Sequence, residues 1–221
     1  MIYEDSQFII YYNECDKVYL EKLINIIKRR MPRIVSFFQI SYDEKIVIKL
    51  YDNLDKYVSN IEESFRIEAE KENKEPMKYE SWMIANTWDG NVNMQSLDLL
   101  VKNPGFENYT EEEFLFNACH EFTHLCQRKV NSPNPDWFWE VLATVLGNPE
   151  CQGESDVVIS IDKLENNFGS ENGYNEVYKI GKYLFDNYDK DFILSLVYDN
   201  EKMYEVVGEV ISKLNGSIIK Y

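Results

Sequence analysis

The two histidines of the chain lie close together, in the pentapeptide His-Glu-Phe-Thr-His at residues 120–124. On a helix, which turns by about 100° per residue, His120 and His124 share one face and can together hold one metal ion. Glu121 then projects from the flank of that face, where its carboxylate can take a proton from metal-bound water. The pattern H-E-x-x-H on a helix therefore predicts a hydrolytic metal site with Glu121 as the general base.

The residues around the pentapeptide independently predict a helix over Thr110–Lys129. Thr110 and Glu113 can form a capping box, while acidic residues at the start and basic residues at the end suit the helix dipole. The alternative is a chance pentapeptide with packed or solvated histidines. Random placement of two histidines rarely gives this spacing with a glutamate between them.

A third protein ligand is needed, because catalytic zinc sites usually combine three protein ligands with one open position. No further histidine exists, so the ligand must be Cys, Asp or Glu. Glu140 is the best candidate. It is the only acidic residue between Asp136 and Glu150, on an apolar helix predicted over Pro135–Leu146. A lone carboxylate on such a helix requires a partner.

Other interpretations of this region remain open. Asp136 is the second candidate ligand, although an aspartate at a helix start usually acts as a cap, as Asn134 is also expected to do. Glu140 can instead pair with Arg128 or Lys129, or lie at a solvated edge.

The cysteines are expected to be reduced. Cys119 and Cys126 flank the pentapeptide, but they lie on other helical faces than the histidines, and buried packing is expected of both. The four cysteines of the chain contain no C-x-x-C pair.

The order of the predicted elements indicates an α+β fold. Strands are expected at Gln7–Tyr12, at Lys45–Tyr51, and in a hairpin of Ser81–Thr87 and Val92–Leu97 around Asp89-Gly90-Asn91. Further helices are expected at Asp16–Arg30, Leu54–Lys71, Tyr174–Tyr188, Asp191–Tyr198 and Lys202–Leu214. The segment Gly147–Gly173 is expected to be a long loop or short irregular insertion. We expect an N-terminal α/β lobe over residues 1–130, which carries the H-E-x-x-H helix, and a helical C-terminal lobe over residues 131–221, which carries the third ligand.

The motif helix, a short loop and then Trp-x-x-Glu-x-x-Ala at residues 137–143 resemble the gluzincin peptidases, the thermolysin-like superfamily, and more narrowly its small bacterial members. The resemblance covers most of the chain. It implies a zincin-like fold with a mixed sheet and an active-site cleft between the two lobes. It also implies one zinc ion per chain, on His120, His124 and Glu140, and hydrolysis of peptide bonds by metal-activated water with Glu121 as base.

The resemblance suggests further roles and shows two departures. Tyr174 begins a Tyr-rich helix like that of the family and is a candidate oxyanion stabiliser, with a half-buried structural role as the alternative. The family has Gly after the ligand Glu, where this chain has Val141. It often has an acidic residue that orients a ligand histidine where this chain has Thr144. The departures motivate an alternative function, a zincin-fold module that binds metal and a protein partner with weak or no catalysis.

The composition of the chain restricts which kinds of partner it can bind. The formal net charge of −16, with a pI near 4.6 and no basic stripe, argues against a nucleic-acid partner. The apolar runs are too short to span a membrane, and the start MIYEDSQFII lacks a basic region and a cleavage site. We therefore expect a cytoplasmic protein. The resemblance to gluzincins, and not the composition, implies a peptide or protein substrate.

Overall fold

The computed structural model describes residues 1–147, 158–167 and 173–218. The chain divides into two compact units, one formed by Met1–Met31 with Tyr42–Leu125 and the other by Pro32–Ser41 with Cys126–Tyr221. The predicted division after residue 130 stays a prediction. No helix in the described ranges is both long enough and apolar enough to cross a membrane.

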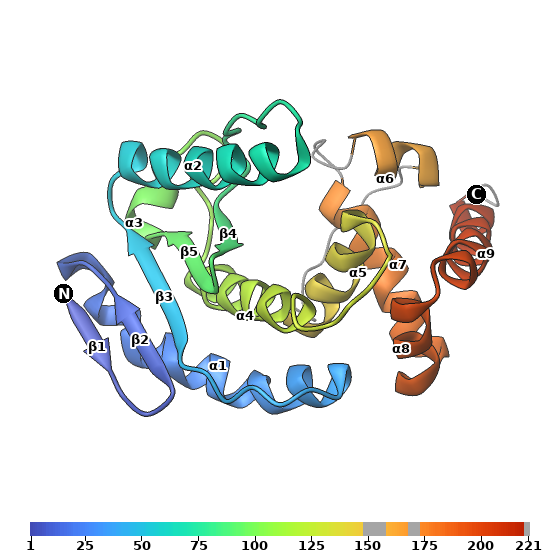
Figure 1. Cartoon of the computed structure of the whole chain (residues 1–221), viewed down its shortest axis with the longest axis horizontal. Coiled ribbons are helices and arrows are strands. Elements are labelled where there is room, and N and C mark those ends of the chain that lie inside the picture. Colours follow the sequence, from blue (N-terminus) through green and yellow to red (C-terminus); the bar gives the residue numbers. More distant parts are fainter. Residues whose placement is uncertain (148–157, 168–172, 219–221) are drawn as a thin grey trace. The chain divides into compact units, whose positions relative to one another are not determined.

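The first unit contains a five-stranded mixed sheet in the order β1-β2-β3-β5-β4 (Figure 1). Its strands are β1 (Ile2–Glu4), β2 (Phe8–Tyr11), β3 (Ile46–Tyr51), β4 (Ala85–Trp88) and β5 (Asn91–Gln95). The three central strands are parallel, whereas β1 and β4 run antiparallel to their neighbours at the two edges. The α+β class with a mixed sheet is confirmed, while β1 was not predicted.

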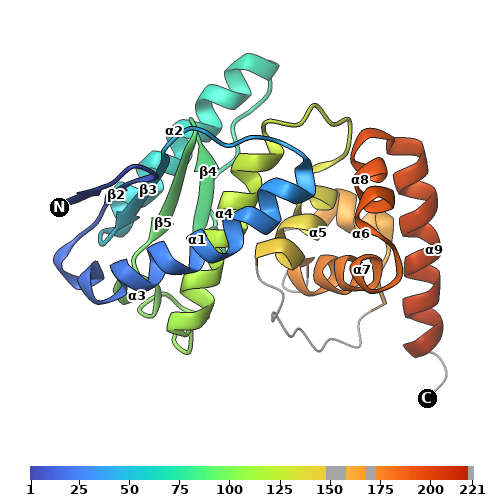
Figure 2. The ribbon, with the colours of Figure 1, turned by 90° about the horizontal axis from the view of Figure 1, so that it is seen from below.

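Helices cover both faces of this sheet (Figure 2). They are α1 (Lys17–Phe38, of which the part to Met31 belongs to this unit), α2 (Leu54–Glu72) and α4 (Glu111–Gln127), besides the short α3 (Leu97–Leu100) and a 3-10 turn at Glu14–Asp16. Helix α1 packs on α4, since the Tyr19 and Phe114 rings lie 5.8 Å apart. On the opposite face, Tyr57 and Ile61 of α2 form a buried cluster against which Tyr51 of β3 packs.

Local sequence signals explain the limits of several elements. The hairpin turns through Asp89 and Gly90, whose φ angles of 50° and 72° suit a two-residue turn. The predicted capping box of α4 is confirmed, because the Thr110 amide donates to Glu113 and the Glu113 amide to Thr110 Oγ1. Helix α1, in contrast, continues through Pro32 beyond its predicted end.

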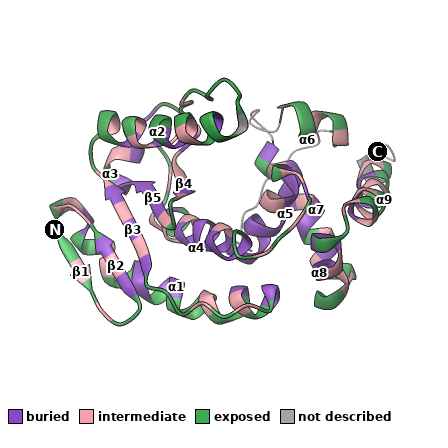
Figure 3. Cartoon of the chain, in the orientation of Figure 1, coloured by how far each residue is buried: buried purple, intermediate pink, exposed green. Residues whose placement is uncertain are grey.

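The second unit is helical. It contains α5 (Asp136–Gly147), α6 (Ile161–Asn167), α7 (Gly173–Asn187), α8 (Lys190–Tyr198) and α9 (Asn200–Ile218), together with the last part of α1. Helix α7 packs against α5, α8 and α9. The segment predicted as a loop includes α6, and its residues 148–157 and 168–172 lie outside the described residues. Figure 3 shows that most of α4 and α5 is buried.

The prediction that Asn134 caps α5 was wrong. Asn134 donates through Nδ2 to the carbonyl oxygens of Leu196 and Val197, at 2.7 and 3.2 Å. The Ser132 hydroxyl donates to the same Val197 oxygen at 2.6 Å. The amide therefore satisfies backbone acceptors at the end of α8, which a sequence-local interpretation does not detect.

A glycine permits the close approach of α7 to α5. A Cβ atom at Gly181 would lie 2.5 Å from the Val141 carbonyl oxygen and 2.6 Å from Val145 Cγ2. Neither backbone can accommodate that overlap without moving. Gly208, in the interior of α9, has open space where its Cβ atom would lie.

We therefore expect opposite effects from two Gly→Ala substitutions in helices. Gly181→Ala should lower the free energy of unfolding by about 1–3 kcal/mol, because it overpacks the α5–α7 contact. Gly208→Ala should raise it by up to about 1 kcal/mol, because alanine favours the helix. Urea unfolding followed by circular dichroism measures both, and equal effects of the two variants would contradict the packing argument.

Candidate metal centre

Helix α4 places the two histidines as the spacing predicts. The Nε2 atoms of His120 and His124 lie 3.0 Å apart, and the ring centroids are 4.7 Å apart at an interplanar angle of 78°. His120 is buried, with 8% of its surface exposed, and His124 is half-buried. Zinc–nitrogen bonds are about 2 Å long, so two nitrogens this close can share one ion.

Glu140 of α5 completes a group of three. One ligand atom from each of His120, His124 and Glu140 lies within 4.8 Å of the others. Ligand atoms on one zinc ion are at most about 4 Å apart, so a small adjustment of the side chains suffices to close the group. Two imidazoles and one carboxylate form a donor set used by catalytic zinc sites, so the residues present fit a zinc ion. This group could hold a metal ion.

Glu121 has a specific partner that the sequence did not indicate. Its side chain is buried, with 5% exposed, and Oε2 accepts a hydrogen bond of 3.0 Å from the Thr87 hydroxyl. Thr87 lies on β4, where it pairs with Val92 of β5. A bond to the ionised carboxylate stabilises that form and fixes its orientation. The sequence did not indicate Thr87, because its contact with Glu121 depends on how β4 packs on α4.

Gln127, the last residue of α4, is also buried, with 4% exposed. Its Nε2 donates to the carbonyl oxygen of Trp139 at 2.9 Å. Trp139 directly precedes Glu140, and the carbonyl groups in the first turn of a helix normally accept bonds from its own backbone. The amide thus connects the end of α4 to the backbone next to the third candidate ligand.

The two departures from the gluzincin pattern take structural roles in α5. The Thr144 hydroxyl donates to the carbonyl oxygens of Glu140, at 2.8 Å, and Val141, at 3.2 Å. It therefore bonds back to its own helix, as buried threonines in helices often do. Val141 is fully buried, and Gly181 of α7 lies against its backbone.

The remaining candidates lie elsewhere or stay untested. Asp136, the first residue of α5, is exposed and does not belong to the converging group in the described part of the chain. Cys119 and Cys126 are fully buried, and burial raises the pKa of each thiol to about 12. At neutral pH both are therefore uncharged thiols. Tyr174 is the second residue of α7, with 38% of its surface exposed, and its oxyanion role stays a prediction.

Comparisons of the chain with protein-family models, with curated proteins and with solved structures gave no match. The function must therefore be argued from the residues of the site.

The metal group predicts a specific pattern of zinc content. Purified wild-type protein should carry about one zinc ion per chain by mass spectrometry. His120→Ala and Glu140→Ala should each lose most of it. Loss of residues that merely orient ligands weakens binding by about 10–100-fold, so loss of a ligand should cost at least as much. Glu112→Ala removes an exposed glutamate from the first turn of α4 and should keep the metal. Full zinc content in Glu140→Ala would exclude Glu140 as a ligand.

Proposed function

We propose that this protein is a zinc-dependent peptidase of the gluzincin type. The observation that carries the proposal is the convergence of His120, His124 and Glu140 ligand atoms within 4.8 Å of one another. A buried carboxylate, Glu121, follows the first histidine on the same helix. Two imidazoles, a carboxylate ligand and a neighbouring base are the groups required for metal-assisted hydrolysis.

Each residue of the proposed site has a separate role in hydrolysis. Zinc bound to this group supplies a Lewis acid that polarises a carbonyl group and lowers the pKa of water. Glu121 accepts a proton from the attacking water at its carboxylate and then donates it to the leaving amine. The Thr87 hydroxyl, 3.0 Å from Oε2, holds that carboxylate in one orientation. Tyr174 is the candidate donor to the oxyanion.

The edge of the sheet suits an extended peptide. In the strand order, β4 is the last strand and pairs only with β5 among the described strands. An added peptide strand would lie about 4.8 Å from β4 and could pair with its outer edge. Because Thr87 of this strand contacts Glu121, a peptide bound there would pass close to the general base. This supports a peptide rather than a small ester as substrate.

Substitution of the base should separate binding of metal from hydrolysis. Glu121→Gln keeps the size of the side chain but cannot accept a proton, so peptide cleavage should fall by about 10²–10⁴-fold. Zinc content should remain that of the wild type. Cleavage of a quenched-fluorescent peptide library, measured together with zinc content, tests both expectations. Undiminished cleavage by Glu121→Gln would refute the assigned base.

The Thr87 hydroxyl should influence kcat more than stability. Thr87→Val removes the bond to Glu121, and we expect kcat to fall by about 10–150-fold, the equivalent of one hydrogen bond to a charged group. Thr123→Val is the matched control, because its buried hydroxyl donates instead to the Cys119 carbonyl oxygen at 2.9 Å. If the two variants lose similar stability but only Thr87→Val lowers kcat, Thr87 is a positioning residue. If both variants had the same kcat, Thr87 would have only a structural role.

The alternative is a metal-binding module with a protein partner and weak or no catalysis. Val141 and Thr144 favour it, since both differ from the gluzincin pattern. Wild-type protein that holds one zinc ion per chain and cleaves no member of the library would support this alternative over the peptidase.

A further inference from the structure

The backbone of Glu140, the third candidate ligand, accepts side-chain hydrogen bonds on both sides of its Cα atom. Gln127 Nε2 donates at 2.9 Å to the carbonyl oxygen of Trp139, the residue before Glu140. The Thr144 hydroxyl donates at 2.8 Å to the carbonyl oxygen of Glu140 itself. Each of the two peptide groups that flank this Cα atom is therefore held by a side-chain donor.

The two donors are buried and come from different helices. Gln127 and Thr144 each expose 4% of their surface, so water competes little for either bond. Gln127 is the last residue of α4, whereas Thr144 lies one turn after Glu140 on α5. All these residues belong to the second unit. The carboxyl end of α4 and a later turn of α5 thus hold the same short stretch of backbone.

The first turns of α5 need such a bond. Asn134, which was expected to cap this helix, donates instead to carbonyl oxygens at the end of α8. The Trp139 carbonyl group would otherwise accept only from the backbone of its own helix. The bond from Gln127 therefore ties the beginning of α5 to the end of α4, three residues after the second histidine.

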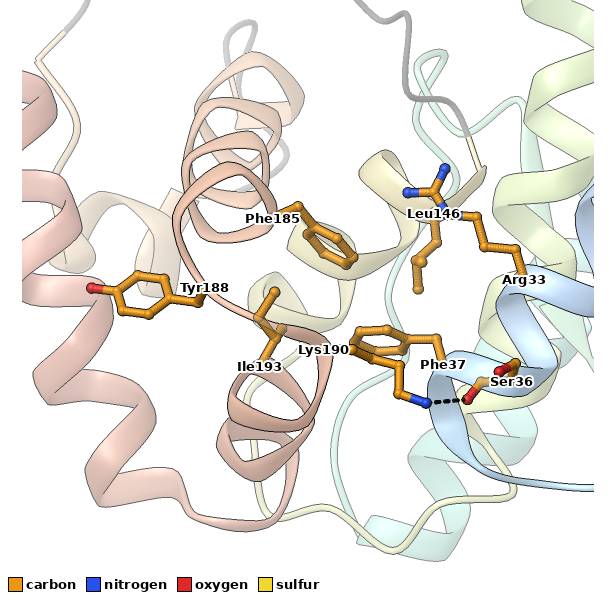
Figure 4. A pocket seen from close by; sticks show the side chains of 8 residues that line it. All are labelled: Arg33, Ser36, Phe37, Leu146, Phe185, Tyr188, Lys190 and Ile193. Carbon is orange, nitrogen blue, oxygen red and sulfur yellow. Dashed lines mark hydrogen bonds between the residues drawn. The ribbon is translucent and has the colours of Figure 1, made fainter.

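Apolar packing holds the rest of α5. Gly181 of α7 lies against its middle. Near its end, Leu146 lines a hollow of about 280 Å³ together with Phe37 and Phe185 (Figure 4). Apolar contacts are non-directional, whereas a hydrogen bond constrains both distance and angle. The two side-chain bonds therefore supply the directional restraint next to the candidate ligand.

A metal ligand needs this restraint. The ligand atoms of the group lie within 4.8 Å of one another and must come within about 4 Å to share a zinc ion. Groups in a working site have to be held within about 0.5 Å of the required geometry. With its backbone fixed, Glu140 can make this adjustment by rotation about its side-chain bonds, without movement of the helix.

We propose that Gln127 and Thr144 are positioning residues of the metal centre, which hold the backbone of Glu140 so that its carboxylate reaches the ion. Gluzincins often have an acidic residue at the position of Thr144, where it orients a ligand histidine. In this chain the hydroxyl restrains the third ligand instead. The inference rests on the proposed function, because it requires that Glu140 binds zinc.

The first test compares two buried amides of the second unit. Gln127→Met removes the donor but keeps a side chain of similar length. Its zinc dissociation constant, measured by competition with a fluorescent chelator, should rise by about 10–100-fold, the usual cost of losing a group that orients a ligand. Asn134→Leu is the matched control, because Asn134 also donates to backbone carbonyl groups, but at the end of α8. It should change zinc affinity less than about twofold.

The second test uses the hydroxyl of Thr144. Thr144→Ser keeps a hydroxyl and should bind zinc within about twofold of the wild type, whereas Thr144→Val should weaken binding by at least about tenfold. Cobalt(II) in place of zinc gives a spectroscopic readout, because its visible absorption depends on ligand geometry. The absorption should change in Gln127→Met and Thr144→Val, and should keep its wild-type form in Thr144→Ser and Asn134→Leu.

The outcomes separate this inference from the proposed function. Zinc affinity and a cobalt spectrum that stay at wild-type values in Gln127→Met and Thr144→Val would overturn the positioning roles and leave the metal centre intact. Equal weakening of zinc binding by Gln127→Met and Asn134→Leu would also overturn them, since it would reflect a general loss of stability. No zinc in the wild type, or full zinc binding by Glu140→Ala, would refute the metal centre itself and this inference with it.

Discussion

Helix α4 buries polar side chains at residues 120, 121, 123 and 127, and each costs free energy unless it finds a partner. The helix itself provides partners for two of them, since Thr123 donates to the Cys119 carbonyl oxygen and His120 Nε2 lies 3.0 Å from His124 Nε2. A strand supplies the hydroxyl for Glu121, and the backbone of α5 accepts the bond from Gln127. The need to satisfy these groups therefore fixes which elements can pack on α4, and the same packing brings the Glu121 carboxylate and the Thr87 hydroxyl together.

The packing of α5 shows how Val141, the residue after the candidate ligand Glu140, is accommodated. Where gluzincins have a glycine after the ligand glutamate, this chain has the larger Val141. The space is provided by the opposite helix, because Gly181 of α7 lets its backbone approach the Val141 carbonyl.

Elements with local signals could be predicted from the sequence, and features that depend on distant partners could not. Periodicity and the Thr110–Glu113 capping box defined α4, and Asp89-Gly90 defined the hairpin. The continuation of α1 through Pro32 was missed, because burial of Phe37 and Phe38 outweighs the lost backbone bond. The histidine spacing and the lone Glu140 likewise predicted three residues whose ligand atoms converge and could hold a metal ion, since both arguments use one or two neighbouring helices. The contribution of Thr87 requires the sheet to be packed on the helix first.

The division of the chain limits how its units can be transferred by recombination and determines the order in which they fold. Each unit consists of two separate stretches, and the chain passes from one unit to the other within α1 and again within α4, between Leu125 and Cys126. No single gene segment encodes either unit, so recombination cannot transfer one of them as an uninterrupted module. On the ribosome, residues 32–41 emerge long before the rest of their own unit, which must therefore form after the first. Truncation near residue 125 would end the chain directly behind the second histidine.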